Sequence, residues 1–254
     1  MFGARFVLMR RVKSLRSDGD RHVVTLSEDV GDATARVVVL ATGVTYRRLG
    51  VAALEDLVGA GVFYGASISQ AQALTGQQVY IVGGGNSAGQ AAMYVSRFAA
   101  QVTLVIRAAS PAASMSAYLR KQIAAVPNIA VLGDTEVVDG GGDGRLECLT
   151  LRTRSTGETR TAPAAALLVM IGAQPRTEWL PEAIQRDERG FIATDRDIDA
   201  DRWPLERQPY SLETSLPGVF AVGDVRQCSV KRVASAAGEG AIVVPSVFQI
   251  LTTA

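Results

Sequence analysis

Cysteine and histidine are scarce in this sequence, and their scarcity argues against several kinds of chemistry. Among 254 residues there are two cysteines, Cys148 and Cys228, and a single histidine, His22. Two cysteines far apart in the chain do not make the framework of a small disulfide-rich protein, and they suit a reducing compartment, so we expect a cytoplasmic protein. A lone histidine argues against a Ser-His-Asp hydrolase and against a histidine-based metal site.

Long apolar runs and clusters of like charge are also missing. No uninterrupted apolar run approaches the roughly 20 residues that a membrane-spanning helix needs, so we expect no membrane partner. The formal net charge is +1 and Lys and Arg do not cluster, which argues against a nucleic-acid partner. Hydrophobic residues make up 48% of the chain, which is enough for the core of one large domain or two small ones.

Strand-like and helix-like segments alternate in the middle of the chain, which predicts an α/β fold. Between about residues 60 and 165 strands and helices follow each other in βαβ order, so we expect a parallel sheet with right-handed crossovers. Residues 1–58 read as mostly β. A helix closes the chain after residue 230, and Pro245 inside it predicts a kink or an early stop.

A glycine-rich turn separates a predicted strand from a predicted helix in "YIVGGGNSAGQAAMYVSRFAAQVTLVIR", which begins at Tyr80. Gly83, Gly85 and Ala88 match the spacing G-x-G-x-x-G/A of dinucleotide-binding turns. The glycines permit a tight turn and a close approach of a pyrophosphate, and the small Ala88 lets the helix pack closely on the strand. Free N–H groups at the helix start would then hold the phosphates. The alternative is a glycine turn that binds no ligand.

Three more residues refine this prediction. Asn86 and Ser87 stand at the expected helix start and are candidates for its cap. The next strand ends at Ile106-Arg107 with no acid nearby. NAD sites commonly place an acid at this strand tip and NADP sites tend to place an arginine there, so Arg107 favours NADPH. The alternative is that Arg107 is a solvated strand end.

Four segments spread over nearly the whole chain share a family pattern: "LATGVTYRRL" from Leu40, "GGGNSAGQAA" from Gly83, "VMIGAQPRT" from Val169 and, most specifically, "ETSLPGVFAVGDVRQCSVKRVASAAGEG" from Glu213. In these segments the chain resembles the low-molecular-weight thioredoxin reductases and their FAD- and NAD(P)-dependent flavoprotein relatives. It implies two Rossmann-like nucleotide-binding domains, each a three-layer arrangement around a parallel sheet. An NAD(P)H-binding domain of residues 60–166 would be inserted into a truncated FAD-binding domain of residues 1–59 and 167–254. The resemblance also implies a homodimer whose two domains rotate to bring nicotinamide to flavin.

The same resemblance assigns residues to FAD. They follow two apolar strands and would hold the ribityl chain and the pyrimidine edge of the flavin: Thr42, Gly43, Gly223, Asp224, Lys231, Arg232, Val233 and Ala234. Amides at a helix N-terminus stabilise negative charge on a reduced flavin, which agrees with this assignment. The alternative for Asp224 is a turn or helix-capping aspartate.

The chain departs from the family at its redox cysteines. Where thioredoxin reductases carry a C-A-T-C-D stretch, this sequence has "GVFYGASISQ", with Gly65 and Ile68 at the cysteine positions and Ser69 at the aspartate. A dithiol relay needs an attacking and a resolving thiol, so we expect no such relay. Cys148 lies in an apolar strand and is expected in the core, whereas Cys228 follows Asp224 in a loop and leaves open a single-thiol role.

A second departure concerns the FAD phosphates. The family begins with a separate strand–glycine–helix turn for the FAD pyrophosphate, but the resemblance here starts at Phe2, and no other G-x-G-x-x-G precedes Gly83. We therefore expect this unit to be missing, which would leave the strands at 37–40 and 219–222 without neighbours. The chain is then a fragment, the product of a late start codon or one part of a split protein.

The predicted NADPH site also departs from the family. Ala108 and Ala112 replace arginines that relatives carry after the strand tip, so selectivity for NADPH over NADH stays open.

These features predict an NAD(P)H-dependent, FAD-containing oxidoreductase that passes hydride from NADPH to flavin and on to an unknown acceptor without a CxxC relay. The alternative is a non-catalytic NADPH-binding fragment or module of a larger flavoprotein. A third interpretation is that the chain descends from a thioredoxin reductase. The missing cysteines argue against thioredoxin reductase chemistry, although not against that ancestry. No side chain stands out as a general acid or base.

Overall fold

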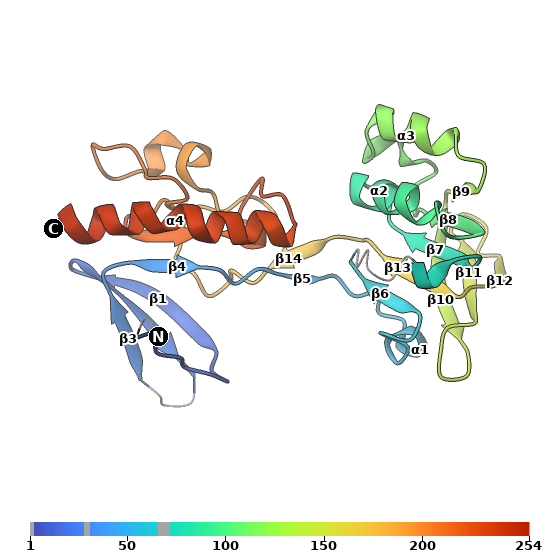
Figure 1. The fold of residues 1–254 in the computed structure, drawn as a ribbon, viewed down its shortest axis with the longest axis horizontal. Helices are drawn as coiled ribbons and strands as arrows, with labels where there is room; N and C mark the ends of the chain where they lie inside the picture. Colours follow the sequence, from blue (N-terminus) through green and yellow to red (C-terminus); the bar gives the residue numbers. More distant parts are fainter. Residues whose placement is uncertain (1–2, 28–30, 66–71, 254) are drawn as a thin grey trace. The chain divides into compact units, whose positions relative to one another are not determined.

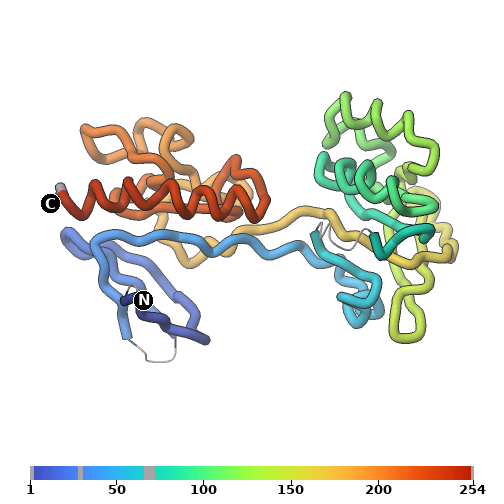
Figure 2. The backbone as a smooth tube through the Cα atoms, viewed as in Figure 1, coloured from blue at the N-terminus to red at the C-terminus, as the bar shows by residue number. Residues whose placement is uncertain are grey.

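The structure, a computed structural model, describes residues 3–27, 31–65 and 72–253. The chain divides into two compact units, a terminal unit of Met1–Thr45 with Gln174–Ala254 and a middle unit of Tyr46–Ala173 (Figure 1). Strands β5 (Val44–Tyr46) and β14 (Ala173–Pro175) pair with each other and carry the chain out of the terminal unit and back into it, as the tube in Figure 2 shows.

A five-stranded parallel sheet forms the centre of the middle unit (Figure 1). Its strands lie in the order β6-β13-β7-β8-β9, and all four neighbouring pairs are parallel. Their bounds are β6 Val62–Tyr64, β13 Ala166–Val169, β7 Gln78–Val82, β8 Gln101–Val105 and β9 Ile129–Leu132. The central strands are largely apolar and buried, since both faces of the sheet are covered, although β8 also contains the buried Thr103.

Different layers cover the two faces of this sheet. Helices α2 (Asn86–Val95) and α3 (Ala117–Ala124) pack on one face, in a core that includes Ile81 and Leu104. An antiparallel sheet of β10 (Thr135–Gly141), β11 (Cys148–Thr153) and β12 (Thr159–Pro163) packs on the other, in a core that includes Val82 and Leu149. The short helices α1 (Ala52–Glu55) and η2 (Pro111–Ala113) complete the unit. The middle unit is thus a three-layer α/β structure.

The terminal unit is built on a short pair of parallel strands, β4 (Val38–Leu40) and β15 (Val219–Ala221). An antiparallel sheet of β1 (Val12–Asp18), β2 (Arg21–Leu26) and β3 (Asp32–Ala35) precedes them. The 3-10 helices η3 (Asp195–Asp197), η4 (Ala200–Arg202) and η5 (Gly223–Val225) lie in the long C-terminal segment, which ends in α4 (Val233–Thr253). All three residues of β15 are fully buried, because separate apolar clusters cover its two faces.

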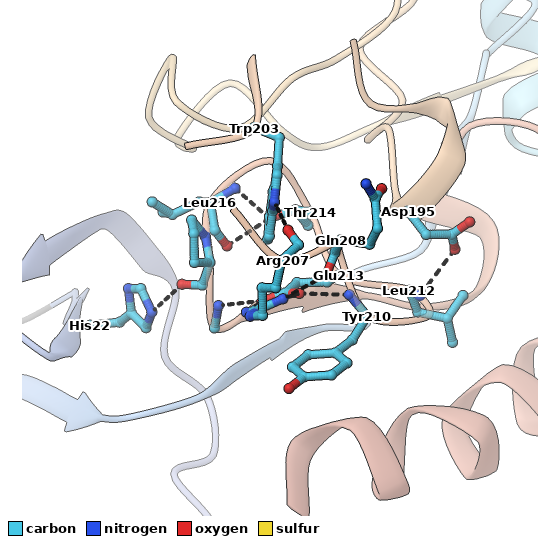
Figure 3. Close-up of polar contacts among 12 residues, drawn as sticks. His22, Asp195, Trp203, Arg207, Gln208, Tyr210, Leu212, Glu213, Thr214 and Leu216 are labelled. Atoms are coloured by element: carbon cyan, nitrogen blue, oxygen red, sulfur yellow. Dashed lines mark hydrogen bonds and ion pairs between the residues drawn. The ribbon is translucent and has the colours of Figure 1, made fainter. Parts of the chain in front are cut away.

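An ion pair between the buried Glu213 and the half-buried Arg207 holds the loop that leads into β15 (Figure 3). The carboxylate of Glu213 is fully buried and accepts two hydrogen bonds from the guanidinium of Arg207, at 2.8 and 2.9 Å. It also accepts the backbone N–H groups of Tyr210 and Gly218, at 2.8 and 2.9 Å. Four hydrogen bonds compensate this carboxylate for its lost hydration, so its burial is tolerated.

The unit boundaries differ from those expected at residues 59/60 and 166/167. The compact units divide at 45/46 and 173/174, so the middle unit also contains α1 and the end of β13. The reason is packing, because Leu54 of α1 is fully buried in the core below the antiparallel sheet, and Val169 belongs to the same core.

Two predictions about the terminal unit are wrong. The strands expected to lack neighbours pair with each other, and β15 is also bonded on its other side, where Thr214 N donates to Val219 O and Ala221 N donates to Leu212 O. Of the kink or early stop predicted at Pro245, the early stop is wrong, because helix α4 runs on to Thr253. Apolar contacts of Val243 and Val247 on either side of the proline hold the helix against the unit and offset the hydrogen bond that proline cannot make.

Helix α4 also changes the expectation about membranes. Among the described residues it is the one helix that is long and apolar enough to cross a membrane, judged by length and composition alone. Polar residues and glycines interrupt its apolar run, but the helix is apolar as a whole because Glu239 is its only ionisable residue. A single helix of this kind is weak evidence for a span.

Candidate functional site

The glycine turn of the middle unit connects β7 to α2 in a conformation that requires glycine. Gly83 has φ +145°, a backbone conformation that residues with a side chain rarely adopt. A Cβ atom at Gly83 would lie 2.5 Å from the carbonyl oxygen of Met170 and 3.2 Å from Cβ of Ala88. Ala88 is fully buried in the same core as the strand. The first glycine and the alanine therefore permit the close packing that the sequence motif predicts.

The helix start is open to an anionic ligand. Gly85 is the N-cap of α2, and the nearest atom to a Cβ built on it is the carbonyl oxygen of Ser114 at 3.9 Å, so a ligand has room to approach. Asn86 and Ser87 follow on the exposed side of the first turn, which contains no acidic residue. Since the first N–H groups of an α-helix lack partners inside the helix, they are available to a phosphate. These residues fit the pyrophosphate of a dinucleotide.

The prediction that Asn86 or Ser87 caps α2 is wrong. The N-cap position belongs to Gly85, and no side chain makes a cap hydrogen bond there. Instead, Oδ1 of Asn86 accepts the backbone N–H of Ser116 at 2.8 Å, at the start of α3. The hydroxyl of Ser114 donates to the carbonyl oxygen of Gly84 at 2.8 Å. The loop after β8 is thereby tied to the glycine turn by contacts thirty residues apart in the chain, which local sequence patterns do not predict.

Arg107 lies at the same edge of the sheet as this turn. β7 and β8 are parallel neighbours in which Val82 pairs with Val105, so Gly83 and Arg107 both follow carboxyl ends of adjacent strands. The side chain of Arg107 is exposed, and its carbonyl oxygen accepts a hydrogen bond of 3.1 Å from Nη1 of Arg154. Adjacent carboxyl ends of parallel strands are where dinucleotides bind in such sheets.

Four of the residues predicted to hold flavin lie together at the carboxyl end of the β4–β15 pair in the terminal unit. Leu40 of β4 pairs with Ala221 of β15, so Thr42-Gly43 and Gly223-Asp224 follow neighbouring parallel strands. Gly223 has φ +74°, and a Cβ built on it would lie 3.2 Å from Cβ of Ala236 in α4. This close approach again requires glycine, and it leaves the half-buried Asp224 at the edge of the sheet.

Lys231 points back to the turn that precedes it. Its ammonium group donates to the carbonyl oxygen of Asp224 and to the hydroxyl of Ser229, both at 2.8 Å, and lies 4.3 Å from the centre of the Phe191 ring. Burial lowers the pKa of Lys231. Arg232 is exposed, and α4 begins at the exposed residues Val233 and Ala234. The half-buried carboxylate of Asp224 suits the hydroxyl groups of the ribityl chain, and the exposed start of α4 suits the edge of the flavin ring that becomes negative on reduction. The residues therefore fit the flavin end of FAD.

Sequence reasoning missed a pair of charged residues behind this edge. Glu239 of α4 accepts hydrogen bonds from Nε and Nη2 of Arg226, at 3.1 and 2.7 Å, and from the N–H of Gly223 at 2.6 Å. The bonds to Arg226 hold the pKa of Glu239 below its usual value, and the bonds to Glu239 raise the pKa of Arg226. A single carboxylate in an otherwise uncharged helix was the signal that could have identified it.

The cysteines stand apart from the redox motif. Cys148 is half-buried in β11, where its Sγ contacts the carbonyl oxygen of Gly141 at 3.6 Å, so it is less buried than the core position expected. Cys228 is exposed, with φ +56°. Gly65 has φ +80°, and a Cβ there would lie 2.7 Å from the ring of Tyr46. Ile68 and Ser69 lie outside the described residues.

Within residues 3–27, 31–65 and 72–253, no group of three or more His, Cys, Asp or Glu side chains is placed to hold a metal ion.

Comparison with known proteins identifies the family. Residues 3–240 match the family described as pyridine nucleotide-disulphide oxidoreductase. The chain belongs to this family. Members of the family are oxidoreductases, and the thioredoxin reductases among them use FAD and NADPH.

Individual relatives agree with this family and differ in their own function. A thioredoxin reductase of Streptomyces clavuligerus is 33% identical over 94% of this chain and 69% of its own length. One subunit of the alkyl hydroperoxide reductase of Pseudomonas aeruginosa is 30% identical over 93% of this chain but only 42% of its own length. Among solved structures, thioredoxin reductase from Giardia duodenalis superposes with a TM-score of 0.78 at 27% identity, covering 96% of this chain and 75% of that one. This chain therefore has the family's α/β fold and spans only part of its relatives.

Proposed function

We propose that this chain is an NAD(P)H-dependent flavoprotein oxidoreductase that binds NADPH at the glycine turn of the middle unit. The observation that carries the proposal is the turn itself. Gly83 adopts a conformation that excludes a side chain, Gly85 leaves the start of α2 open, and Arg107 lies at the tip of the neighbouring strand. The N–H groups of Asn86, Ser87 and Ala88 would hold the pyrophosphate, and Arg107 would hold the 2′-phosphate.

We assign the terminal unit to FAD. When bound, NADPH and FAD supply hydride transfer, and the chain holds and orients them. Asp224 and the Gly223 turn would hold the ribityl chain, and the amides of Val233 and Ala234 would face the flavin edge. Within the described part of the terminal unit, α4 is the only α-helix, and it does not follow a strand through a glycine turn. The FAD pyrophosphate therefore needs a turn from elsewhere, and this chain alone should hold FAD poorly.

The electron acceptor is not a dithiol within this chain, because Cys148 and Cys228 cannot form a CxxC pair.

The second candidate function is an NADPH-binding module of a larger flavoprotein. It is favoured by the match to the alkyl hydroperoxide reductase subunit, of which this chain covers only 42%. A purified protein with a flavin absorption spectrum supports the enzyme, and a colourless one supports the module. A cytoplasmic homodimer remains the expectation from the sequence.

Thermal unfolding with and without millimolar NADPH tests the dinucleotide site. We expect NADPH to raise the melting temperature of the wild type, since a ligand that binds only the folded state stabilises it. Gly85→Leu fills the open approach to the helix start and should abolish this shift. The control is Gly141→Ala, because Gly141 has open space around it at the far end of the antiparallel sheet. No shift in the wild type, or an unchanged shift in Gly85→Leu, contradicts the assignment.

A further inference from the structure

Arg154 lies beside Arg107, although the two residues are far apart in the chain. Arg154 follows β11, in the turn that leads to β12 of the antiparallel sheet. Its Nη1 donates a hydrogen bond of 3.1 Å to the carbonyl oxygen of Arg107, 47 positions earlier. A second guanidinium is therefore held at the strand tip where the proposed function places the 2′-phosphate.

The backbone around Arg154 is fixed by the same strand tip. The N–H of Arg154 donates to the carbonyl oxygen of Asp134 at 2.8 Å, and the N–H of Ser155 donates to the Asp134 carboxylate at 3.2 Å. Asp134 in turn donates its own N–H to the carbonyl oxygen of Ala108 at 2.8 Å, from a left-handed conformation of φ +52°. The Arg154 turn is thus anchored to the residue that follows Arg107.

The preceding turn fits tightly against this tip. A Cβ atom at Gly133 would lie 2.1 Å from the carbonyl oxygen of Ala109, so only glycine permits this contact between the two backbones. The N–H of Thr135 donates to the carbonyl oxygen of Ile106 at 3.0 Å. Arg154 therefore occupies a defined place relative to the end of β8, and its position is not that of a free surface arginine.

The carboxylate that pairs with Arg154 is also bound by another arginine. Glu136 accepts hydrogen bonds from Nε and Nη2 of Arg152, at 3.1 and 2.6 Å, whereas Nε of Arg154 is 3.9 Å from its other oxygen. The Arg154 side chain is 49% exposed. Arg152 binds only Oε1 of Glu136, and the ion pair of Arg154 with Oε2 is long and partly exposed, so much of the Arg154 guanidinium stays available to an anion from solvent.

We propose that Arg154 is a specificity-determining residue that contacts the 2′-phosphate of the dinucleotide together with Arg107. This inference rests on the proposed function and adds a residue to it. Two arginines can bind a phosphate through several charge-assisted hydrogen bonds, whereas the adenosine ribose of NADH offers no such anion. Arg154 supplies a second cation at the strand tip of a chain that carries alanine at positions 108 and 112.

Binding of 2′,5′-ADP and 5′-AMP to the full chain, measured by calorimetry, tests this inference. These probes differ by the 2′-phosphate alone. We expect Arg154→Ala to weaken 2′,5′-ADP about tenfold and to change the affinity for 5′-AMP less than about twofold. Arg154→Lys keeps the charge and should recover part of the loss. The control is Arg145→Ala, which removes an exposed arginine from the opposite end of the same sheet.

The salt dependence separates direct contact from a purely structural role. If Arg154 contacts the phosphate, the slope of log Kd for 2′,5′-ADP against log salt concentration should be smaller in Arg154→Ala than in the wild type, because one screened ion pair is lost. An unchanged slope, or an equal loss for both probes, overturns the inference and leaves Arg154 as a tether of the strand tip. If neither probe binds the wild type, it is the proposed NADPH site that fails.

Discussion

The backbone N–H of Gly223 donates a hydrogen bond of 2.6 Å to the carboxylate of Glu239, sixteen residues further along the chain. The same carboxylate is bonded to Arg226, so one side chain of α4 fixes both the turn after β15 and the residue that follows η5. Nη1 of Arg226 extends the network to the hydroxyl of Thr194 at 2.8 Å. The edge proposed for flavin therefore depends on a helix residue outside the predicted site.

Replacing this carboxylate should destabilise the terminal unit. We expect Glu239→Gln to lower the free energy of unfolding by about 1–3 kcal/mol at pH 7, because it weakens bonds to a charged partner and to a buried amide. Chemical denaturation measures the change. Glu206→Gln, on an exposed carboxylate of the same unit, is the control. A loss of stability in Glu239→Gln no larger than in the control would show that the network contributes little.

Glu239 should also make stability depend on acid. Its pKa is held below the usual 4.5 in the folded state, mainly by Arg226. The unfolded chain therefore binds the proton more readily, and the stabilisation present above pH 4.5 is lost as the pH falls through the lower folded pKa. Wild type and Glu239→Gln should differ most near neutral pH and converge in acid. Curves that stay parallel down to low pH would contradict this linkage.

His22 should add a second pH dependence at higher pH. It is buried in β2, with Nε2 3.1 Å from the carbonyl oxygen of Pro217 (Figure 3). Burial lowers its pKa below 6.5. Stability is then complete above pH 6.5 and falls as the pH drops toward the folded pKa, because protonation favours the unfolded chain.

Melting curves of the wild type and His22→Asn between pH 5 and 8 measure this effect. The wild type should lose stability below pH 6.5 by an amount that His22→Asn does not show. The side chains of Arg36, Arg207 and Asp20 line the cleft next to His22, so the comparison should be made at constant ionic strength. An identical pH profile for both proteins would mean that His22 has an ordinary pKa.

Gly83 should tolerate no side chain. Gly83→Ala combines φ +145° with a contact of 2.5 Å to the carbonyl oxygen of Met170, and we expect it to cost about 1–3 kcal/mol of stability and to weaken NADPH binding. Calorimetry and NADPH titration measure the two effects. Gly141→Ala is the matched control, because a Cβ at that position meets no atom within 4 Å. Normal stability and binding in Gly83→Ala would refute the close packing of strand, turn and helix.

Disulfide reduction should be absent even when FAD is supplied. Neither Cys148 nor Cys228 has a partner cysteine nearby in sequence, so an NADPH-dependent disulfide assay should stay at background. Turnover that survives Cys148→Ser together with Cys228→Ser would show that no thiol pair is needed. Turnover lost with Cys228→Ser alone would identify a single-thiol role for this exposed residue.

Introducing the first cysteine of the absent CxxC motif at Gly65 should destabilise the protein. Gly65→Cys places a Cβ 2.7 Å from the Tyr46 ring in a backbone conformation of φ +80°, so the variant should be less stable than the wild type. Tyr46→Ala in the same background should restore part of that stability, because it removes the side chain in the way. Differential scanning calorimetry of both variants measures this, and an undisturbed Gly65→Cys would contradict the steric argument.

The sequence by itself determined the α/β class, the glycine turn and the family. Spacing at Gly83, Gly85 and Ala88 and alternating strand and helix patterns are local properties, since they depend on backbone conformation and on which faces are buried. The same reasoning failed for the cap of α2, because Asn86 bonds to Ser116 across thirty residues. It failed for the early stop at Pro245, because packing of α4 outweighs one lost hydrogen bond. Glu239 beside Gly223 and Arg154 beside Arg107 were decided only by the tertiary structure, since no local pattern encodes which distant side chains meet at the end of a strand.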